Sequence, residues 1–129
     1  MSVERLTDPR LFTPPGYAHV AIATGRTVYT AGAVPFDAEG VLIRPGDVAA
    51  QTAQAIENLL SALDLAGARA EDIARTTVYV VASDPAPLSV AWEVVRASPL
   101  GGAPSTLLGV SALGYTGQLV EIEATAVVG

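Results

Sequence analysis

The sequence predicts an α+β fold, a two-layer sandwich in which two helices cover one face of a mixed six-stranded sheet. β-branched segments that suit strands alternate with two segments whose apolar residues recur at helical spacing, in the order strands, helix, strand, helix, two strands. A chain of 129 residues without repeats or low-complexity linkers also has the size of a single domain, which we expect to span residues 1–129.

The first half of the chain begins with two predicted strands. Residues Tyr17–Ala23 and Thr27–Gly32 suit strands, and Thr24–Arg26 between them is short enough to predict a tight hairpin turn. Pro35–Gly40 is predicted to be a surface loop that leads into a short extended piece at Val41–Ile43. We therefore expect the first two strands to pair with each other.

The first helix is predicted between Asp47 and Gly67. Asp47 is a favourable N-cap residue, and Gly67 is a favourable residue just beyond a helix C-terminus. The residues that recur three or four positions apart between them are Val48, Thr52, Ile56, Leu59 and Leu63. This spacing places one continuous stripe against the sheet.

The second half contains a strand, a helix and two further strands. Ile73–Ala82 is rich in β-branched residues, which predicts a central strand. Pro85–Ala97 is predicted to be a helix whose buried stripe consists of Leu88, Trp92 and Val95. After a loop, the remaining elements are a strand at Pro104–Val110, a turn at Gly114–Gly117 and a last strand at Leu119–Val128.

The composition favours an oligomer and argues against nucleic acid as a partner. Half of the residues are apolar, only 16% are charged and the mean hydropathy is +0.43, so we expect apolar surface to be buried between subunits. The net charge is −6, and the seven arginines are scattered without a basic patch for a phosphate backbone. The absence of cysteine excludes disulfides, thiol nucleophiles and thiolate metal sites.

The sequence has no feature of membrane insertion or export. Its longest uncharged stretch, within residues 97–120, is interrupted by prolines and glycines, which suits loops and strands rather than a spanning helix. The first ten residues, MSVERLTDPR, are charged where a signal peptide needs an apolar run. We therefore expect a cytoplasmic protein that does not associate with membranes.

Two carboxylates in the last strand are the first candidates for chemistry. Glu121 and Glu123 alternate with apolar residues in the segment VEIEA, so strand geometry places both side chains on one face. A charge inside a sheet is costly unless that face meets water, a partner or a substrate. Glu121 can polarise a water or carry a proton, and the alternative is a structural carboxylate at a subunit interface. For Glu123 a structural role is favoured.

Four segments, in this order, resemble the Rid/YjgF family of reactive-intermediate deaminases. They are YTAGAVP at 29–35, GDVAAQTAQAIENLLSAL at 46–63, DIARTTVYV at 72–80 and VEIEATAV at 120–127. The resemblance implies the chorismate-mutase-like YjgF fold and a homotrimer whose sheets form a central barrel. It also implies ligand clefts between subunits, and hydrolysis of 2-imino acids to 2-oxo acids and ammonia without a metal or a cofactor.

The resemblance assigns site residues position by position. The family's catalytic glutamate corresponds to Glu121, and its N-terminal pocket tyrosine corresponds to Tyr17. The arginine that grips the substrate carboxylate in the deaminases corresponds to Thr106. The other substrate-binding positions are Leu108 in place of a cysteine, Ala31 in place of a serine and Ser89 in place of an asparagine.

Thr106 predicts a departure from the usual activity. A guanidinium pairs with a carboxylate through two hydrogen bonds, and losing such a pair costs on the order of 2–5 kcal/mol in a desolvated pocket. We therefore expect an enzyme that hydrolyses, deaminates or tautomerises an imine or enamine metabolite, and that is not a standard 2-imino-acid deaminase. The alternative is a non-catalytic trimer that binds a metabolite or a partner protein in the same cleft.

Other polar and aromatic residues have competing interpretations. His19 is the only histidine and follows Tyr17 by two positions, so it can act as a base or as a cationic substitute for the missing arginine. A hydrogen-bonded structural histidine is the favoured interpretation. Tyr79 and Trp92 are interpreted as core or interface aromatics. Arg75 can reach a pocket from elsewhere in the chain, but an arginine without a functional role is the favoured interpretation.

Overall fold

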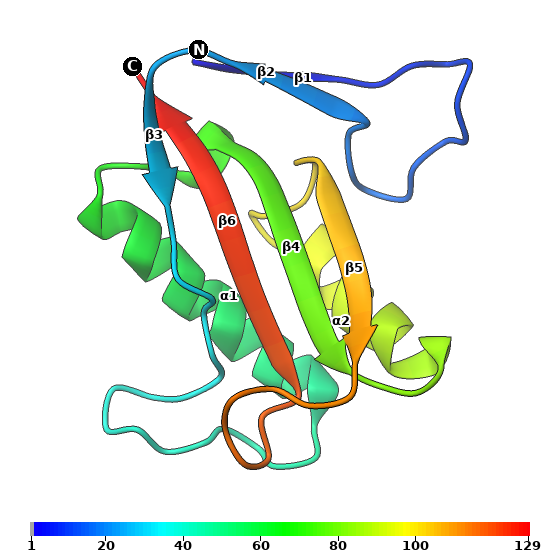
Figure 1. The fold of residues 1–129 in the computed structure, drawn as a ribbon, viewed down its shortest axis with the longest axis vertical. Helices are drawn as coiled ribbons and strands as arrows, with labels where there is room; N and C mark the ends of the chain where they lie inside the picture. The colour runs from blue at the N-terminus through cyan, green and yellow to red at the C-terminus, as the bar shows by residue number, and fades with distance from the viewer. Residues whose placement is uncertain (1) are drawn as a thin grey trace.

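A computed structural model describes residues 2–129, and it contains two helices packed on one face of a four-stranded sheet (Figure 1). The strand order is β3-β6-β4-β5, with β3 at Arg26–Tyr29, β6 at Val120–Val128, β4 at Ile73–Val81 and β5 at Ser105–Val110. β4 and β5 run parallel because helix α2 (Pro85–Arg96) carries the chain back between them, whereas the other neighbours are antiparallel. The predicted α+β class, with both helices on one face, is confirmed.

Helix α1 (Val48–Leu65) begins and ends where the sequence predicts. The Asp47 carboxylate accepts a hydrogen bond from the Ala50 amide at 2.9 Å, which satisfies one free N–H group of the first turn. Gly67, at φ +73°, lies just beyond the helix in the left-handed conformation that favours glycine. The predicted stripe is buried at Thr52, Ile56, Leu59 and Leu63. Within residues 2–129 there is no helix both long and apolar enough to cross a membrane.

The two inner strands, β4 and β6, bury one face and leave the other uncovered. The side chains fully buried against the helices are Val78 and Val80 on β4 and Val120 and Ile122 on β6. The residues between them point to the opposite face, which neither α1 nor α2 covers. This face, called the open face below, carries Glu121 and Glu123 as the alternation predicts.

The predicted hairpin between the first two strands is wrong. β2 (Val20–Ala23) pairs with β1 (Val3–Leu6), whereas β3 pairs with β6. Gly25 lies so close to the end of β6 that a Cβ there would be 2.1 Å from the Val128 carbonyl oxygen. The chain therefore bends onto the sheet edge at Gly25 instead of folding β3 back on β2. The six strands accordingly form two sheets, of two and four strands, rather than the single predicted sheet.

The β1–β2 pair and the loop joining its strands form an arm along the top of the sheet in Figure 1. The Arg5 guanidinium fastens this arm, because it donates hydrogen bonds to the carbonyls of Ala70 and Ile73, each at 2.9 Å. These carbonyls belong to the short 3₁₀ helix η1 (Ala70–Asp72) and to the start of β4. The arm is thus held over one end of the open face.

Candidate functional site

The open face contains a hollow of about 450 Å³, called the sheet hollow below. Strands β4, β5 and β6 contribute side chains to it by alternation, and its lining includes Arg75, Thr77, Tyr79, Thr106, Leu108 and Glu123. Hydroxyl groups and charges make up most of this set. The hollow therefore suits a small polar ligand better than an apolar one.

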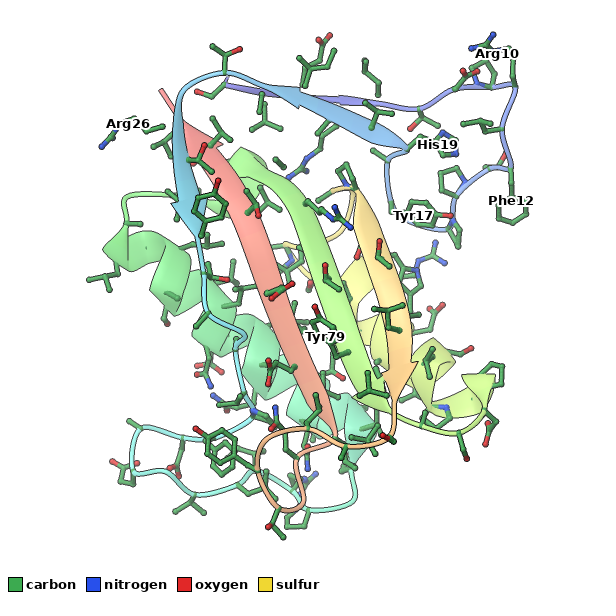
Figure 2. All side chains as sticks on the ribbon, viewed as in Figure 1. Arg10, Phe12, Tyr17, His19, Arg26 and Tyr79 are labelled. Carbon is green, nitrogen blue, oxygen red and sulfur yellow. The ribbon has the colours of Figure 1, made fainter. Side chains whose placement is uncertain are left out.

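Tyr79 and Glu123 form a hydrogen-bonded pair in the sheet hollow. The Tyr79 hydroxyl donates to Glu123 Oε1 at 2.9 Å across neighbouring strands. This bond raises the pKa of Tyr79, burial and the charges of Glu123 and Glu121 add to the rise, and Arg75 opposes it. The phenol therefore stays protonated and holds the Glu123 carboxylate near the centre of the sheet, where Figure 2 shows Tyr79.

Glu121 is held by a buried glutamine. The Gln118 amide donates to Glu121 Oε1 at 3.0 Å and to the Val120 carbonyl at 3.1 Å, and the Gln118 oxygen accepts from the Tyr115 amide. Gln118 is only 3% exposed, so these bonds fix its orientation. The other carboxylate oxygen lies against Gly32, where a Cβ would be 2.2 Å from Oε2. One oxygen of Glu121 is thus anchored, and the other lies beside a residue without a side chain.

A second concave region, the arm cleft, lies between the arm and the first residues of β4 and β5. Its volume is about 500 Å³, and its lining includes Tyr17, His19, Arg75, Ser105 and Thr106. Arg75 and Thr106 line both the arm cleft and the sheet hollow, so the two regions meet at these residues. The structure therefore brings three predicted site residues, Tyr17, His19 and Thr106, to one cleft.

Both ring nitrogens of His19 are engaged by the backbone. Nδ1 accepts a hydrogen bond from the Asp8 amide at 3.0 Å, and Nε2 lies 2.9 Å from the Phe12 carbonyl oxygen. Because an amide N–H can only donate, Nδ1 is unprotonated and Nε2 carries the hydrogen that binds Phe12. His19 thereby fastens the loop between β1 and β2 (Figure 2). This geometry favours the structural interpretation of His19 over a role as a base.

Tyr17 lies just before β2 rather than inside a strand, and it contacts the helix layer. Its ring packs edge-on against Trp92 of α2, with the ring centroids 6.0 Å apart. The Trp92 indole donates a hydrogen bond to the Pro15 carbonyl at 2.7 Å. These two contacts position Tyr17 beside the edge strand β5.

The other predicted site residues are spread over the chain. Leu108 lines the sheet hollow, whereas Ala31 is exposed just beyond β3. Ser89 is exposed on α2, on the opposite side of the sheet from Glu121, and its Oγ lies 3.4 Å from the Pro85 carbonyl. Glu121 borders neither the sheet hollow nor the arm cleft. A single site that contains all of these residues would need more than one chain.

Three residues of this geometry are not among the site residues that the sequence predicts. Tyr79 and Arg75 share the open face of β4, a placement that strand alternation implies but that says nothing about a ligand. Gln118 precedes β6, and its contact with Glu121 depends on the path of a loop, for which the sequence has no signal. In the described part of the chain, residues 2–129, no three His, Asp or Glu side chains are grouped as metal ligands would be.

Comparison with known proteins identifies the family. Residues 10–128 match the sequence profile of the family described as Endoribonuclease L-PSP. The chain belongs to this family, also called the Rid/YjgF family. The assignment confirms the resemblance that the four sequence segments predict.

Relatives of this Rid chain include proteins with known names and known structures. A 2-iminobutanoate/2-iminopropanoate deaminase of Rattus norvegicus is 30% identical over 109 residues, which cover 84% of this chain and 78% of that protein. A RutC family protein of Pyrococcus abyssi is 39% identical over 80 residues, but the match spans only 63% of that protein and 62% of this chain. The crystal structure of a Rid-family protein of unknown function from Yersinia pestis matches with a TM-score of 0.87 at 33% identity, covering 99% of this chain and 100% of that one.

Proposed function

We propose that this Rid chain is a small-molecule enzyme that hydrolyses, deaminates or tautomerises a reactive imine or enamine metabolite. The observation that carries the proposal is the way in which Glu121 is held. Gln118 anchors one carboxylate oxygen, and the absence of a side chain at Gly32 lets the other oxygen lie where a Cβ would collide with it. A carboxylate fixed in this way can orient a water or carry a proton. The name of the rat relative, 2-iminobutanoate/2-iminopropanoate deaminase, supports the reaction class.

In the proposed hydrolysis, Glu121 takes a proton from a water while the water oxygen attacks the carbon of the C=N bond. The π electrons of that bond move to nitrogen, which receives the proton from Glu121. The hydroxyl oxygen of the resulting carbinolamine then forms a C=O bond as the C–N bond breaks, and ammonia leaves. Glu121 carries the hydroxyl proton to the departing nitrogen, so the carboxylate is regenerated.

Thr106 supports a substrate that differs from those in the rat protein's name. Its hydroxyl is exposed where the sheet hollow meets the arm cleft. A hydroxyl can donate one hydrogen bond to the substrate carboxylate, whereas a guanidinium donates two and adds a positive charge. A short 2-imino acid is therefore proposed to bind weakly at this position. Tyr17 is proposed to orient the ligand together with Thr106, and the further proposed contacts are Leu108, Ala31 and Ser89.

The site is proposed to form between the subunits of a homotrimer. One chain leaves Glu121 apart from Tyr17 and Ser89, as described above. The open face also leaves Tyr29 79% exposed and Leu108 42% exposed. Large apolar side chains on an uncovered sheet face favour burial by a second copy of the chain. A neighbouring subunit can then supply the residues that Glu121 lacks.

The second candidate is a non-catalytic trimer that binds a metabolite or a partner protein. A pocket of about 280 Å³ beside β5 favours it, because Phe12, Tyr17, Trp92 and Leu107 give this pocket an apolar lining without Glu121. RNA is a weaker candidate despite the family's ribonuclease description, because the net charge of −6 opposes a phosphate backbone.

The experiment that tests the enzymatic proposal is the Glu121→Gln variant, assayed with imines that an amino-acid oxidase generates in situ. The substitution keeps the size of the side chain and removes the proton acceptor, so we expect kcat/KM to fall about 100-fold or more. Glu57→Gln, at an exposed position of α1, is the matched control and should keep full activity. If wild type turns over no imine or enamine, the binding trimer replaces the enzyme.

A further inference from the structure

Most arginines of the chain have a partner within the structure. Arg5 donates to backbone carbonyls, and the arginines in ion pairs are Arg10, Arg44, Arg69 and Arg96. Within residues 2–129, the side chains of Arg26 and Arg75 form neither an ion pair nor a hydrogen bond, although both residues pair through their backbones in the sheet. Arg26 points away from the sheet edge in Figure 2, as an ordinary solvated arginine does. Arg75 differs because it lies in a concave region.

Arg75 lies on the open face of β4, where the sheet hollow and the arm cleft meet. Among the described residues, Arg75 and Thr106 are the two that line both regions. The polar groups around it are mainly neutral hydroxyls, those of Thr77, Thr106, Thr125 and Tyr79 in the sheet hollow and of Tyr17 in the arm cleft. Because no carboxylate pairs with it among the described residues, its charge is available to an anion.

Glu123 is the carboxylate that lines the sheet hollow together with Arg75, and it is hydrogen-bonded to another residue. Both residues line the sheet hollow, but Glu123 accepts the Tyr79 hydroxyl and forms no ion pair with Arg75. The partner of Arg75 on β6 is the neutral Thr125. The open face therefore has a cationic end at Arg75 and an anionic end at Glu121 and Glu123. A ligand with a carboxylate at one end and an imine N–H group at the other, which can donate a hydrogen bond to a carboxylate, is complementary to this arrangement.

The strand register sets the distance between these two ends. On the open face, the pairs of β4 with β6 are Tyr79 with Glu121, Thr77 with Glu123 and Arg75 with Thr125, and Thr77 also pairs with Thr106 of β5. A strand rises about 3.3 Å per residue, so Thr106 lies roughly 7 Å along the strands from Glu121, and Arg75 lies roughly 13 Å from it. An anion at Arg75 is thus farther from Glu121 than one at Thr106.

We propose that Arg75 binds the carboxylate of the ligand, and that more atoms separate this carboxylate from the reacting carbon than in a 2-imino acid. The carboxylate end lies at Arg75 and Thr106, and the imine end lies toward Glu121. The imine of an amino dicarboxylic acid has such a second, more distant carboxylate. This inference rests on the proposed function, because it takes Glu121 as the group that acts on the imine.

The test compares two stable 2-oxo acids, the class of product that hydrolysis of a 2-imino acid yields. 2-Oxoglutarate has a second carboxylate at its far end, and 2-oxobutanoate does not. By isothermal titration calorimetry we expect wild type to bind 2-oxoglutarate about tenfold more tightly, because a charge-assisted pair is added. Arg75→Gln should remove this difference. Arg75→Lys should keep part of this difference in affinity, because lysine keeps the positive charge but cannot form the two parallel hydrogen bonds of a guanidinium.

Arg26→Gln is the matched control, because it removes the other arginine without a partner and should leave both affinities unchanged. The inference is overturned if wild type shows no measurable binding of 2-oxoglutarate, or if Arg75→Gln binds it as tightly as wild type does. It is also overturned if inorganic phosphate binds as tightly as 2-oxoglutarate, because the attraction would then be unspecific.

Failure of this inference can be told apart from failure of the proposed function. If no imine is turned over but 2-oxoglutarate binding depends on Arg75, the anion site stands and the enzymatic role fails. If turnover depends on Glu121 while Arg75→Gln changes neither KM nor affinity, the enzymatic role stands and the assignment of Arg75 fails.

Discussion

Thr106 occupies the position at which, by family resemblance, the deaminases carry an arginine. Thr106→Arg should create or increase deaminase activity toward 2-iminopropanoate by about tenfold or more, because the new guanidinium can pair with the carboxylate beside the imine. The rate is measured as pyruvate formation while an amino-acid oxidase generates the imine from alanine. Thr116→Arg, in the exposed loop before β6, is the control. Equal, substantial rates for wild type and Thr106→Arg would show that the missing arginine does not limit the reaction.

Gly32 sets the position of the Glu121 carboxylate. A Cβ at residue 32 would meet Oε2 at 2.2 Å, and Gly32 does not have a positive φ, so alanine displaces the carboxylate without straining the backbone. Gly32→Ala should lower kcat about 100-fold with little change in Tm. Gly114→Ala, whose Cβ would meet nothing within 4 Å, should leave both unchanged. Unfolding of Gly32→Ala, detected by circular dichroism, would contradict this account.

The sequence predicts the position of a side chain when that position depends only on the neighbouring residues of the same strand or helix. Alternation in VEIEA places Glu121 and Glu123 on one face, and the structure agrees. The bond between Tyr79 and Glu123 joins residues 44 positions apart, and the bond from Gln118 depends on a loop. Strand register decides which side chains meet across a sheet, and register is set by the assembled sheet rather than by a local pattern.

Among the secondary-structure elements, those with their own start and stop signals are predicted to within two residues. The two helices have aspartate N-caps, and β4, β5 and β6 are rich in β-branched and apolar residues and lie between turns or loops. The pairing of β1 with β2 has no such signal. The strand VERL contains two charged residues, and its partner lies beyond a long loop that the His19 side chain fastens by hydrogen bonds.

The arm should loosen when its anchor is removed. Arg5→Ala deletes the hydrogen bonds to the Ala70 and Ile73 carbonyls, so we expect a loss of about 1–3 kcal/mol in local stability. Hydrogen exchange should accelerate at the β1 and β2 amides and stay unchanged in β4 and β6. Arg10→Ala, which removes only an exposed ion pair with Asp8, should have little effect. Unchanged exchange in Arg5→Ala would show that the arm is held by other contacts.

At the scale of the whole molecule, the proposed site requires that three chains assemble into a trimer. Light scattering should give three times the 13.1 kDa chain mass at micromolar concentration. Leu108→Glu places a charge on the open face and should shift the protein to smaller species. Leu65→Glu, at a position 92% exposed at the end of α1, should remain trimeric. A clean wild-type monomer would contradict both the trimer and any site between subunits.

The order of the strands in the sheet also constrains how the chain folds. β6 lies between β3 and β4, although ribosomes synthesise it last of the three. In the pairing of β3 with β6, Arg26 lies opposite Val128, so most of the chain separates the two strands. The chain between β4 and β5, which contains α2, is far shorter, so closing that loop costs less entropy. We therefore expect β3 to stay detached until the C-terminal segment arrives. Glu121 and Glu123 reach the open face only at that moment, so the candidate chemistry appears with the final step of folding.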